Sequence, residues 1–152
     1  MDTQKQQLSA NFTREEFELE GPMPESSVPA FEFLANRILE QIRLQFSEPM
    51  EITSGHRSEA GNAEANGNPH SEHVSTPDYC AADWTMPRFK ADMRGVFDWI
   101  RLSSGLPFHI VVLEHGKSGD VIHTSWHRDA SSRVAKEGST HNASPYIEWA
   151  IG

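Results

Sequence analysis

Two apolar, β-branched stretches late in the sequence constrain the fold most strongly, because their spacing predicts a hairpin. Residues 108–114 and 121–126 both have the composition of strands, and Lys117-Ser118-Gly119-Asp120 between them favours a turn. Strands joined by so short a connection must pair antiparallel. The sequence therefore predicts an antiparallel sheet in this part of the chain.

Amphipathic stretches elsewhere predict helices that pack on this sheet. Apolar residues recur at helical spacing over 29–46 and again over 87–102, and Thr13 and Glu16 have the spacing of a capping box at the start of an earlier helix. Helices and strands do not alternate regularly, which indicates an α+β fold with a small antiparallel sheet packed against helices. In the 87–102 helix the expected inward residues are Phe89, Met93, Val96, Phe97 and Ile100.

Length and charge narrow the classes of protein. The 152 residues fit one domain, 1–152, with a core over about 8–127 and a polar tail, 128–152, of which part should dock on the core. The net charge of −9 argues against nucleic-acid binding, and no apolar run is long enough for membrane insertion. The first residues contain no apolar signal-peptide core. We therefore expect the protein to be made in the cytoplasm and to reach its place of action after release or as part of a virion. The sequence leaves the oligomeric state open.

The segment 71–84 holds the residues with the clearest chemistry. His73 and Asp83 flank a turn-rich stretch, and Asp83 lies within the short, mostly apolar run 80–84, which predicts a buried strand that holds it rigidly. His123, in the second arm of the hairpin, is the best third partner. Imidazole and carboxylate groups are good zinc ligands, and catalytic zinc sites usually have three protein ligands. The sequence therefore predicts a zinc site at the sheet, made by His73, Asp83 and His123.

Other residues compete for these roles. Asp78 is an alternative acidic ligand, although it lies in the turn and not in the strand. The chain has one cysteine, Cys80, which excludes an intramolecular disulfide. A cysteine hydrolase built on it is a remote alternative, because Cys80 reads as a buried strand residue. The histidines ranked below the predicted ligands, as pocket lining or substitutes, are His56, His70, His115 and His127.

Glu114 and Arg57 are the candidate catalytic groups. Glu114 ends one hairpin arm while His123 lies on the other, so it can serve as general base. Arg57 follows a tight Ser-Gly turn, and its planar guanidinium suits a substrate carboxylate or a developing oxyanion. Each has a plainer interpretation, as a solvated charge at a strand end and as a structural arginine. Amide hydrolysis is the reaction that this set suits best.

Together these segments resemble the zinc D-Ala-D-Ala carboxypeptidase family, the VanX-like and phage-endolysin peptidases that cleave peptidoglycan peptides. The resemblance implies zinc at His73, Asp83 and His123, Glu114 as base and Arg57 in contact with substrate. The segments that carry it are Leu8-Ser9-Ala10-Asn11-Phe12-Thr13 with Glu16-Phe17 for "LSxNFTxxE", Ser54-Gly55-His56-Arg57-Ser58 for "SGYRS", Ser71-Glu72-His73 for "SxH", Ala81-Ala82-Asp83 for "AxD", and Val121-Ile122-His123-Thr124-Ser125 for "WVHVS".

The chain also departs from that pattern. Ten positions separate His73 from Asp83, three more than in the family's HxxGxAxD spacing, so the additional residues must loop outward. His109 and Ile110 replace the Asp-Gln pair common before the glutamate. The leading hypothesis is a zinc metallopeptidase acting on peptidoglycan peptides, as a D-Ala-D-Ala carboxypeptidase or an L-Ala-D-Glu endopeptidase. The alternative is a non-catalytic, zinc-bearing structural or binding module of a virion or cell-wall protein.

Overall fold

A six-stranded sheet forms the centre of the protein in the computed structural model, which describes residues 5–64, 71–129, 133–139 and 145–152. The strand order is β1-β2-β4-β3-β5-β6, and every pair is antiparallel except β3–β5. The α+β prediction is confirmed. The strands are β1 (Glu51–Ser54), β2 (Tyr79–Thr85), β3 (Ile110–Gly116), β4 (Gly119–His127), β5 (Val134–Ser139) and β6 (Ile147–Trp149).

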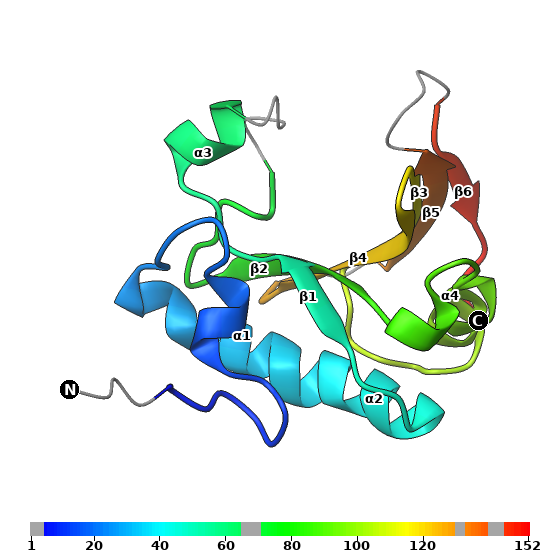
Figure 1. The fold of residues 1–152 in the computed structure, drawn as a ribbon, viewed down its shortest axis with the longest axis horizontal. Coiled ribbons are helices and arrows are strands. Elements are labelled where there is room, and N and C mark those ends of the chain that lie inside the picture. Colours follow the sequence, from blue (N-terminus) through cyan, green and yellow to red (C-terminus); the bar gives the residue numbers. More distant parts are fainter. Residues whose placement is uncertain (1–4, 65–70, 130–132, 140–144) are drawn as a thin grey trace.

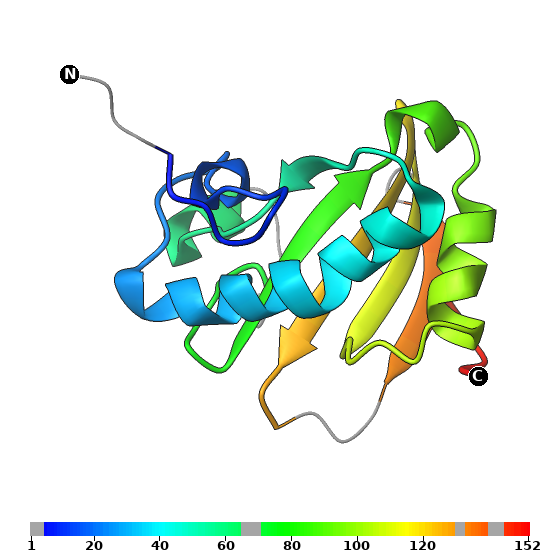
Figure 2. The same cartoon turned by 90° about the horizontal axis from the view of Figure 1, so that it is seen from below.

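The predicted 108–126 hairpin is present as β3 and β4. The predicted long helix is also present, as α1 (Val28–Leu34), a π-helical turn (Ala35–Leu39) and α2 (Glu40–Phe46) in one continuous run. It ends at Ser47, whose left-handed φ of 51° stops helix propagation. The helical run crosses one side of the sheet, while the short helix α3 (Glu59–Glu64) lies on the other side (Figures 1 and 2).

The prediction of a single helix over 87–102 is wrong for the first half of this range. Residues Pro87–Phe89 form a 3₁₀ turn, and α4 spans Arg94–Leu102. Two hydrogen bonds from the hairpin hold the intervening loop: the Asp120 carboxylate accepts from the Met93 amide, and the Asp120 amide donates to the Lys90 carbonyl. These tertiary bonds outcompete helical ones, and Phe89 is left exposed and not inward.

Alternation along the central strands gives the sheet two different faces. Side chains of successive strand residues point to opposite faces, and directly paired residues share a face. Cys80, Ala82 and Trp84 of β2 are fully buried in the core, with Ile122 of β4 and Leu113 of β3. Their neighbours in sequence, which include Asp83, His123 and Glu114, therefore lie on the face turned away from α1 and α2.

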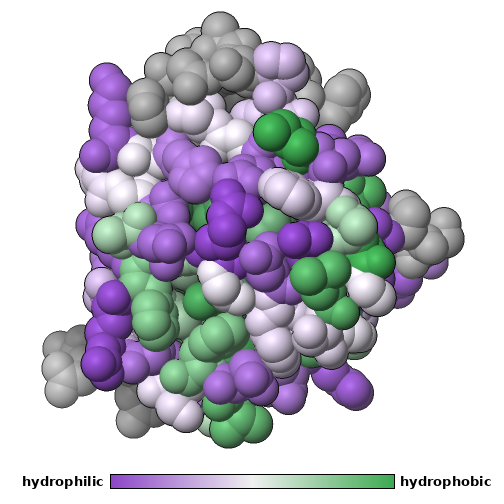
Figure 3. Space-filling view, turned by 90° about the vertical axis from the view of Figure 1, so that its right-hand side faces the viewer, coloured by the Kyte–Doolittle hydropathy of each residue, from purple (hydrophilic) through white to green (hydrophobic). Residues whose placement is uncertain are grey.

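The tail docks as two strands at one edge of the sheet. β5 pairs parallel with β3, and β6 then pairs antiparallel with β5. Apolar and polar side chains are interspersed on the side of the molecule that carries α4 and β6 (Figure 3). Among the described residues, no helix has the length and apolar character needed to cross a bilayer.

Candidate metal centre

The three predicted ligands lie together on the face of the sheet that is turned away from α1 and α2. Asp83 on β2 and His123 on β4 are directly paired, and His123 Nδ1 lies 2.9 Å from Asp83 Oδ1. His73 Nε2 lies 3.3 Å from the same oxygen. One ligand atom from each of the three residues falls within 4.8 Å of the other two. Pairing between neighbouring strands thus brings together residues that are forty positions apart.

His73 is held by the loop that follows β1. Its Nδ1 lies 2.8 Å from the Gly55 carbonyl oxygen, and its own carbonyl accepts a hydrogen bond from the Arg57 amide at 2.8 Å. A carbonyl can only accept, so Nδ1 carries a proton, and Nε2 beside Asp83 is the nitrogen that a metal could use. Gly55 is required here because a Cβ atom at this position would collide with the Phe17 carbonyl.

Glu72 is a functional candidate that the sequence analysis did not single out. Its Oε1 lies 3.2 Å from His123 Nε2 and its Oε2 lies 2.6 Å from His127 Nε2. A carboxylate on the outer nitrogen of a ligating histidine fixes the tautomer that leaves the inner nitrogen for a metal. Glu72 is the variable position of the "SxH" segment, so no motif marked it; only the fold brings it to His123.

The charges of the cluster favour a cation. Burial alone would raise the pKa of Asp83, but the neighbouring His73 and the hydrogen bond from His123 outweigh it and hold this pKa well below its usual range. Burial is outweighed in the same way at Glu72, where His123 lowers the pKa to about 2. Burial opposes protonation of His123, but Asp83 and Glu72 together raise its pKa to about 10. Two ionised carboxylates with imidazoles between them form a donor set that fits a divalent metal.

Glu114 stands beside this cluster. It lies two residues along β3 from Val112, the strand partner of His123, and therefore on the same face. Burial, and then the negative charge of Asp83, raise the pKa of Glu114. Tyr146 comes close as well: Gly138 pairs with Glu114 in the sheet, and a Cβ atom on Gly138 would collide with the Tyr146 ring. The sequence predicts that part of the tail docks on the domain, but only the structure brings the tail to this site.

Arg57 lies near the cluster, and one nitrogen of its guanidinium is bound to Glu20. Its Nε donates to Glu20 Oε2 at 2.7 Å, and the other Glu20 oxygen accepts from the Ser54 hydroxyl. The positive charge of Arg57 is nevertheless close enough to oppose the rise in the pKa of Glu114. The structure therefore places Arg57 beside the site in a defined orientation.

The insertion between His73 and Asp83 forms a turn that leaves Asp83 in place. The Thr76 amide donates to the Tyr79 carbonyl, and Asp78 is exposed and paired with Arg128 at 3.1 Å. Arg128 follows β4, so this pair anchors the turn to the end of the sheet. The competing acidic residue, Asp78, consequently lies outside the cluster.

Three of the alternative candidates, His56, His115 and Cys80, lie outside the His73–Asp83–His123 cluster. His56 is buried with Nδ1 2.7 Å from the Ser75 hydroxyl, and burial lowers its pKa. His115 lies on the opposite face of the hairpin, and His70 lies outside the described residues. Cys80 is fully buried in the core and burial raises the pKa of its thiol, which argues against a thiolate nucleophile.

Two imidazoles, one carboxylate and an adjacent glutamate are the groups that zinc peptidases use. Comparison with known families matches residues 10–106 to Peptidase M15, and the chain belongs to this family. Peptidases of this family depend on zinc in general. The matched range includes Arg57, His73 and Asp83 and ends before Glu114 and His123. No curated protein and no solved structure gives a significant match.

Proposed function

We propose that the protein is a zinc metallopeptidase that hydrolyses an amide bond in peptidoglycan peptides. The observation that carries the proposal is the convergence of His73, Asp83 and His123 on one face of the sheet, with Glu114 beside them. Membership of Peptidase M15 supports peptide hydrolysis. The peptidoglycan substrate and the D-Ala-D-Ala carboxypeptidase or L-Ala-D-Glu endopeptidase type follow from the resemblance of the ordered sequence segments. In this proposal the protein reaches the cell wall after release or in a virion.

His73 Nε2, Asp83 Oδ1 and His123 Nδ1 would hold the zinc ion. When bound, zinc acts as a Lewis acid on a carbonyl oxygen and lowers the pKa of a coordinated water. Glu114 then has the position and the protonation behaviour of a general base, because its raised pKa lies closer to neutral than that of an exposed glutamate. It accepts the proton of the attacking water and passes it to the leaving amine.

Arg57 would bind the substrate. Its Nε is used by Glu20, so the terminal guanidinium nitrogens are the groups that would meet a peptide carboxylate or the developing negative charge. Glu20 thus orients Arg57, in the way that Glu72 orients His123. Both catalytic assignments can be tested apart from metal binding.

The decisive experiment combines zinc content with digestion of purified muropeptides. The zinc-loaded protein should release D-alanine or cleave the stem peptide, and Glu114→Gln should retain zinc while losing about 10²–10⁴-fold in kcat. Glu148→Gln, a matched change of an exposed residue on β6, should leave both properties unchanged. A zinc-loaded protein that leaves every muropeptide intact would refute the proposal.

One observation favours the alternative of a non-catalytic zinc-bearing module. The ion pair between Arg57 and Glu20 satisfies part of the guanidinium that a substrate would otherwise engage. In that case Glu114→Gln would change neither cell-wall binding nor any other function of the protein. Binding of the variant to insoluble peptidoglycan, compared with its hydrolytic activity, separates the two functions.

A further inference from the structure

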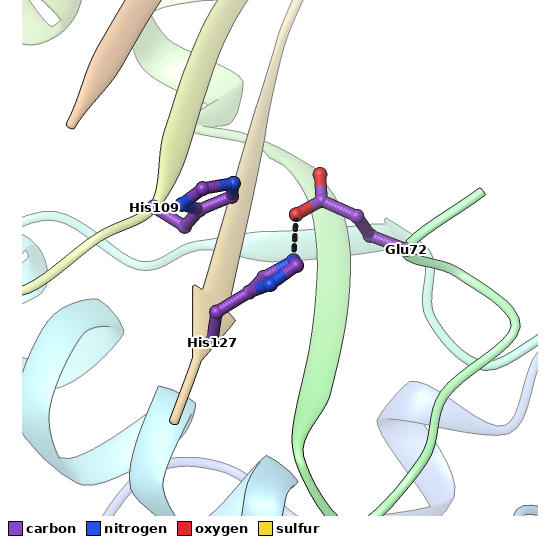
Figure 4. A group of neighbouring side chains, drawn as sticks. All are labelled: Glu72, His109 and His127. Atoms are coloured by element: carbon purple, nitrogen blue, oxygen red, sulfur yellow. Dashed lines mark hydrogen bonds and ion pairs between the residues drawn. The ribbon is translucent and has the colours of Figure 1, made fainter. Parts of the chain in front are cut away.

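A second group of side chains with potential metal-ligand atoms lies next to the first, on the same face of the sheet. His127 is four residues beyond His123 on β4, His109 immediately precedes β3, and Glu72 comes from the loop before β2. One ligand atom from each lies within 4.8 Å of the other two. The two imidazoles and the carboxylate face a common space (Figure 4).

Each member of this group is positioned by the fold. The His109 amide donates to the Ser125 carbonyl at 2.8 Å, and the His109 carbonyl accepts from the Val134 amide at 2.9 Å. The ring of His127 lies between those of His109 and Tyr79, with centroid distances of 4.0 and 5.1 Å. The backbone and ring contacts reduce the freedom that the two imidazoles would lose on binding a ligand.

The chemistry of the group suits a transition metal. Two imidazole nitrogens and one carboxylate oxygen are a common donor set for zinc and related divalent ions. All three residues are only partly buried, so an ion could enter from solvent. Glu72 and His127 are in contact at 2.6 Å, and the ring centroid of His109 lies 4.0 Å from that of His127, so three potential ligand atoms meet at one place.

We propose that Glu72, His109 and His127 form a second divalent-cation site adjacent to the His73–Asp83–His123 cluster. Glu72 links the two, because its Oε1 bonds the outer nitrogen of His123 while its Oε2 faces His127. A cation at the second site draws on the Oε2 atom and leaves Oε1 to orient His123. Glu72 is thus a ligand of the second site in this proposal and a hydrogen-bond partner of a ligand of the first.

The test counts bound metal in a set of single and double variants. Apo-protein titrated with Zn²⁺ or Co²⁺ should bind about two equivalents, and His127→Gln or His109→Gln should each bind about one. His73→Gln should also bind one equivalent, and the double variant H73Q/H127Q should bind none. His115→Gln is the matched control, since His115 lies on the opposite face and should leave the count at two.

The design separates this site from the first. If the first cluster binds no metal, His73→Gln would match the wild type, and one equivalent would still disappear in His127→Gln. A wild-type count of one that His127→Gln and His109→Gln both leave unchanged overturns the second site. Circular dichroism checks that each variant is folded, and the two independent histidine variants guard against a folding defect in either one.

Discussion

His123 and His115 lie on the two arms of the same hairpin and have the same kind of surroundings on opposite faces. Each imidazole lies between two carboxylates: His123 between Asp83 and Glu72, and His115 between Asp120 and Glu137. The side chain of His123 is 13% exposed and that of His115 is 39% exposed. Two carboxylates around a histidine are therefore not enough to distinguish a metal site from a structural one.

The difference lies in what the carboxylates contact next. Asp83 also meets a second imidazole, that of His73, whereas Glu137 meets the guanidinium of Arg94 and the indole nitrogen of Trp149. In the first case two imidazoles, whose nitrogens can serve as metal ligands, converge on one carboxylate oxygen. In the second case the carboxylate faces a guanidinium and an indole N–H, which donate hydrogen bonds and do not bind a metal. The cluster at His123 can accept a cation, while the cluster at His115 already contains one and ties α4 to β5 and β6.

The largest expected effect separates the two histidines directly. His123→Gln should abolish zinc binding at the first cluster and reduce peptidase activity to background, because the remaining pair cannot complete a three-ligand site. His115→Gln should keep both. Zinc titration and muropeptide digestion measure this, and equal loss in the two variants would contradict the distinction.

A smaller effect is expected from the carboxylates behind each histidine. Glu72→Gln should raise the zinc concentration needed for half-maximal activity by about 10–100-fold, because the outer nitrogen of His123 loses its anionic partner. Glu137→Gln, the matched change behind His115, should leave this concentration unchanged. Reactivation of the apo-protein with buffered zinc measures this concentration. If the Glu72 variant behaves like the wild type, Glu72 does not contribute to zinc binding at the first cluster.

The pH dependence of metal binding sharpens the comparison further. The pKa of about 10 means that both ring nitrogens of metal-free His123 are protonated throughout the neutral range, so zinc must displace one proton to bind. Zinc affinity should therefore rise about tenfold per pH unit between about pH 6 and pH 8. Competition with a zinc chelator measures the slope, and His115→Gln should not alter it. A flat profile would show that zinc does not displace a proton from His123.

The smallest effect concerns folding stability. The hydrogen bond to Glu137, opposed by burial and reinforced by Asp120, raises the pKa of His115 above its ordinary value of about 6.5. The protonated form is favoured in the folded state, so its contribution is complete below the ordinary pKa and is lost as pH rises through the raised one. Because His115 is substantially exposed, the difference between wild type and His115→Gln should stay within about 1 kcal/mol.

Urea denaturation at a series of pH values measures this contribution. The stability advantage of the wild type should be greatest in mildly acidic solution and should shrink as pH rises above about 6.5. An advantage that grows with pH would mean that the neutral imidazole, not the protonated one, is favoured by the fold.

Local pattern was sufficient for several parts of this structure. The hairpin, the buried strand that carries Asp83 and the long helix all follow from hydrophobic periodicity and turn residues, which act between near neighbours. The split of the 87–102 helix did not, because the hydrogen bonds of Asp120 that cause it come from a distant strand. The parallel docking of β5 on β3 likewise depends on a long-range pairing with no local signal.

For the site, the sequence by itself determined which imidazoles and carboxylates were available and that Asp83 and His123 lie on strands. Only the tertiary structure decided that they are paired on the same face, that the three additional residues turn outward, and that Glu72 stands behind His123. The physical reason is that strand register and loop path depend on contacts between residues far apart in the chain. Such contacts give His123 and His115 different surroundings although both are histidines on one hairpin.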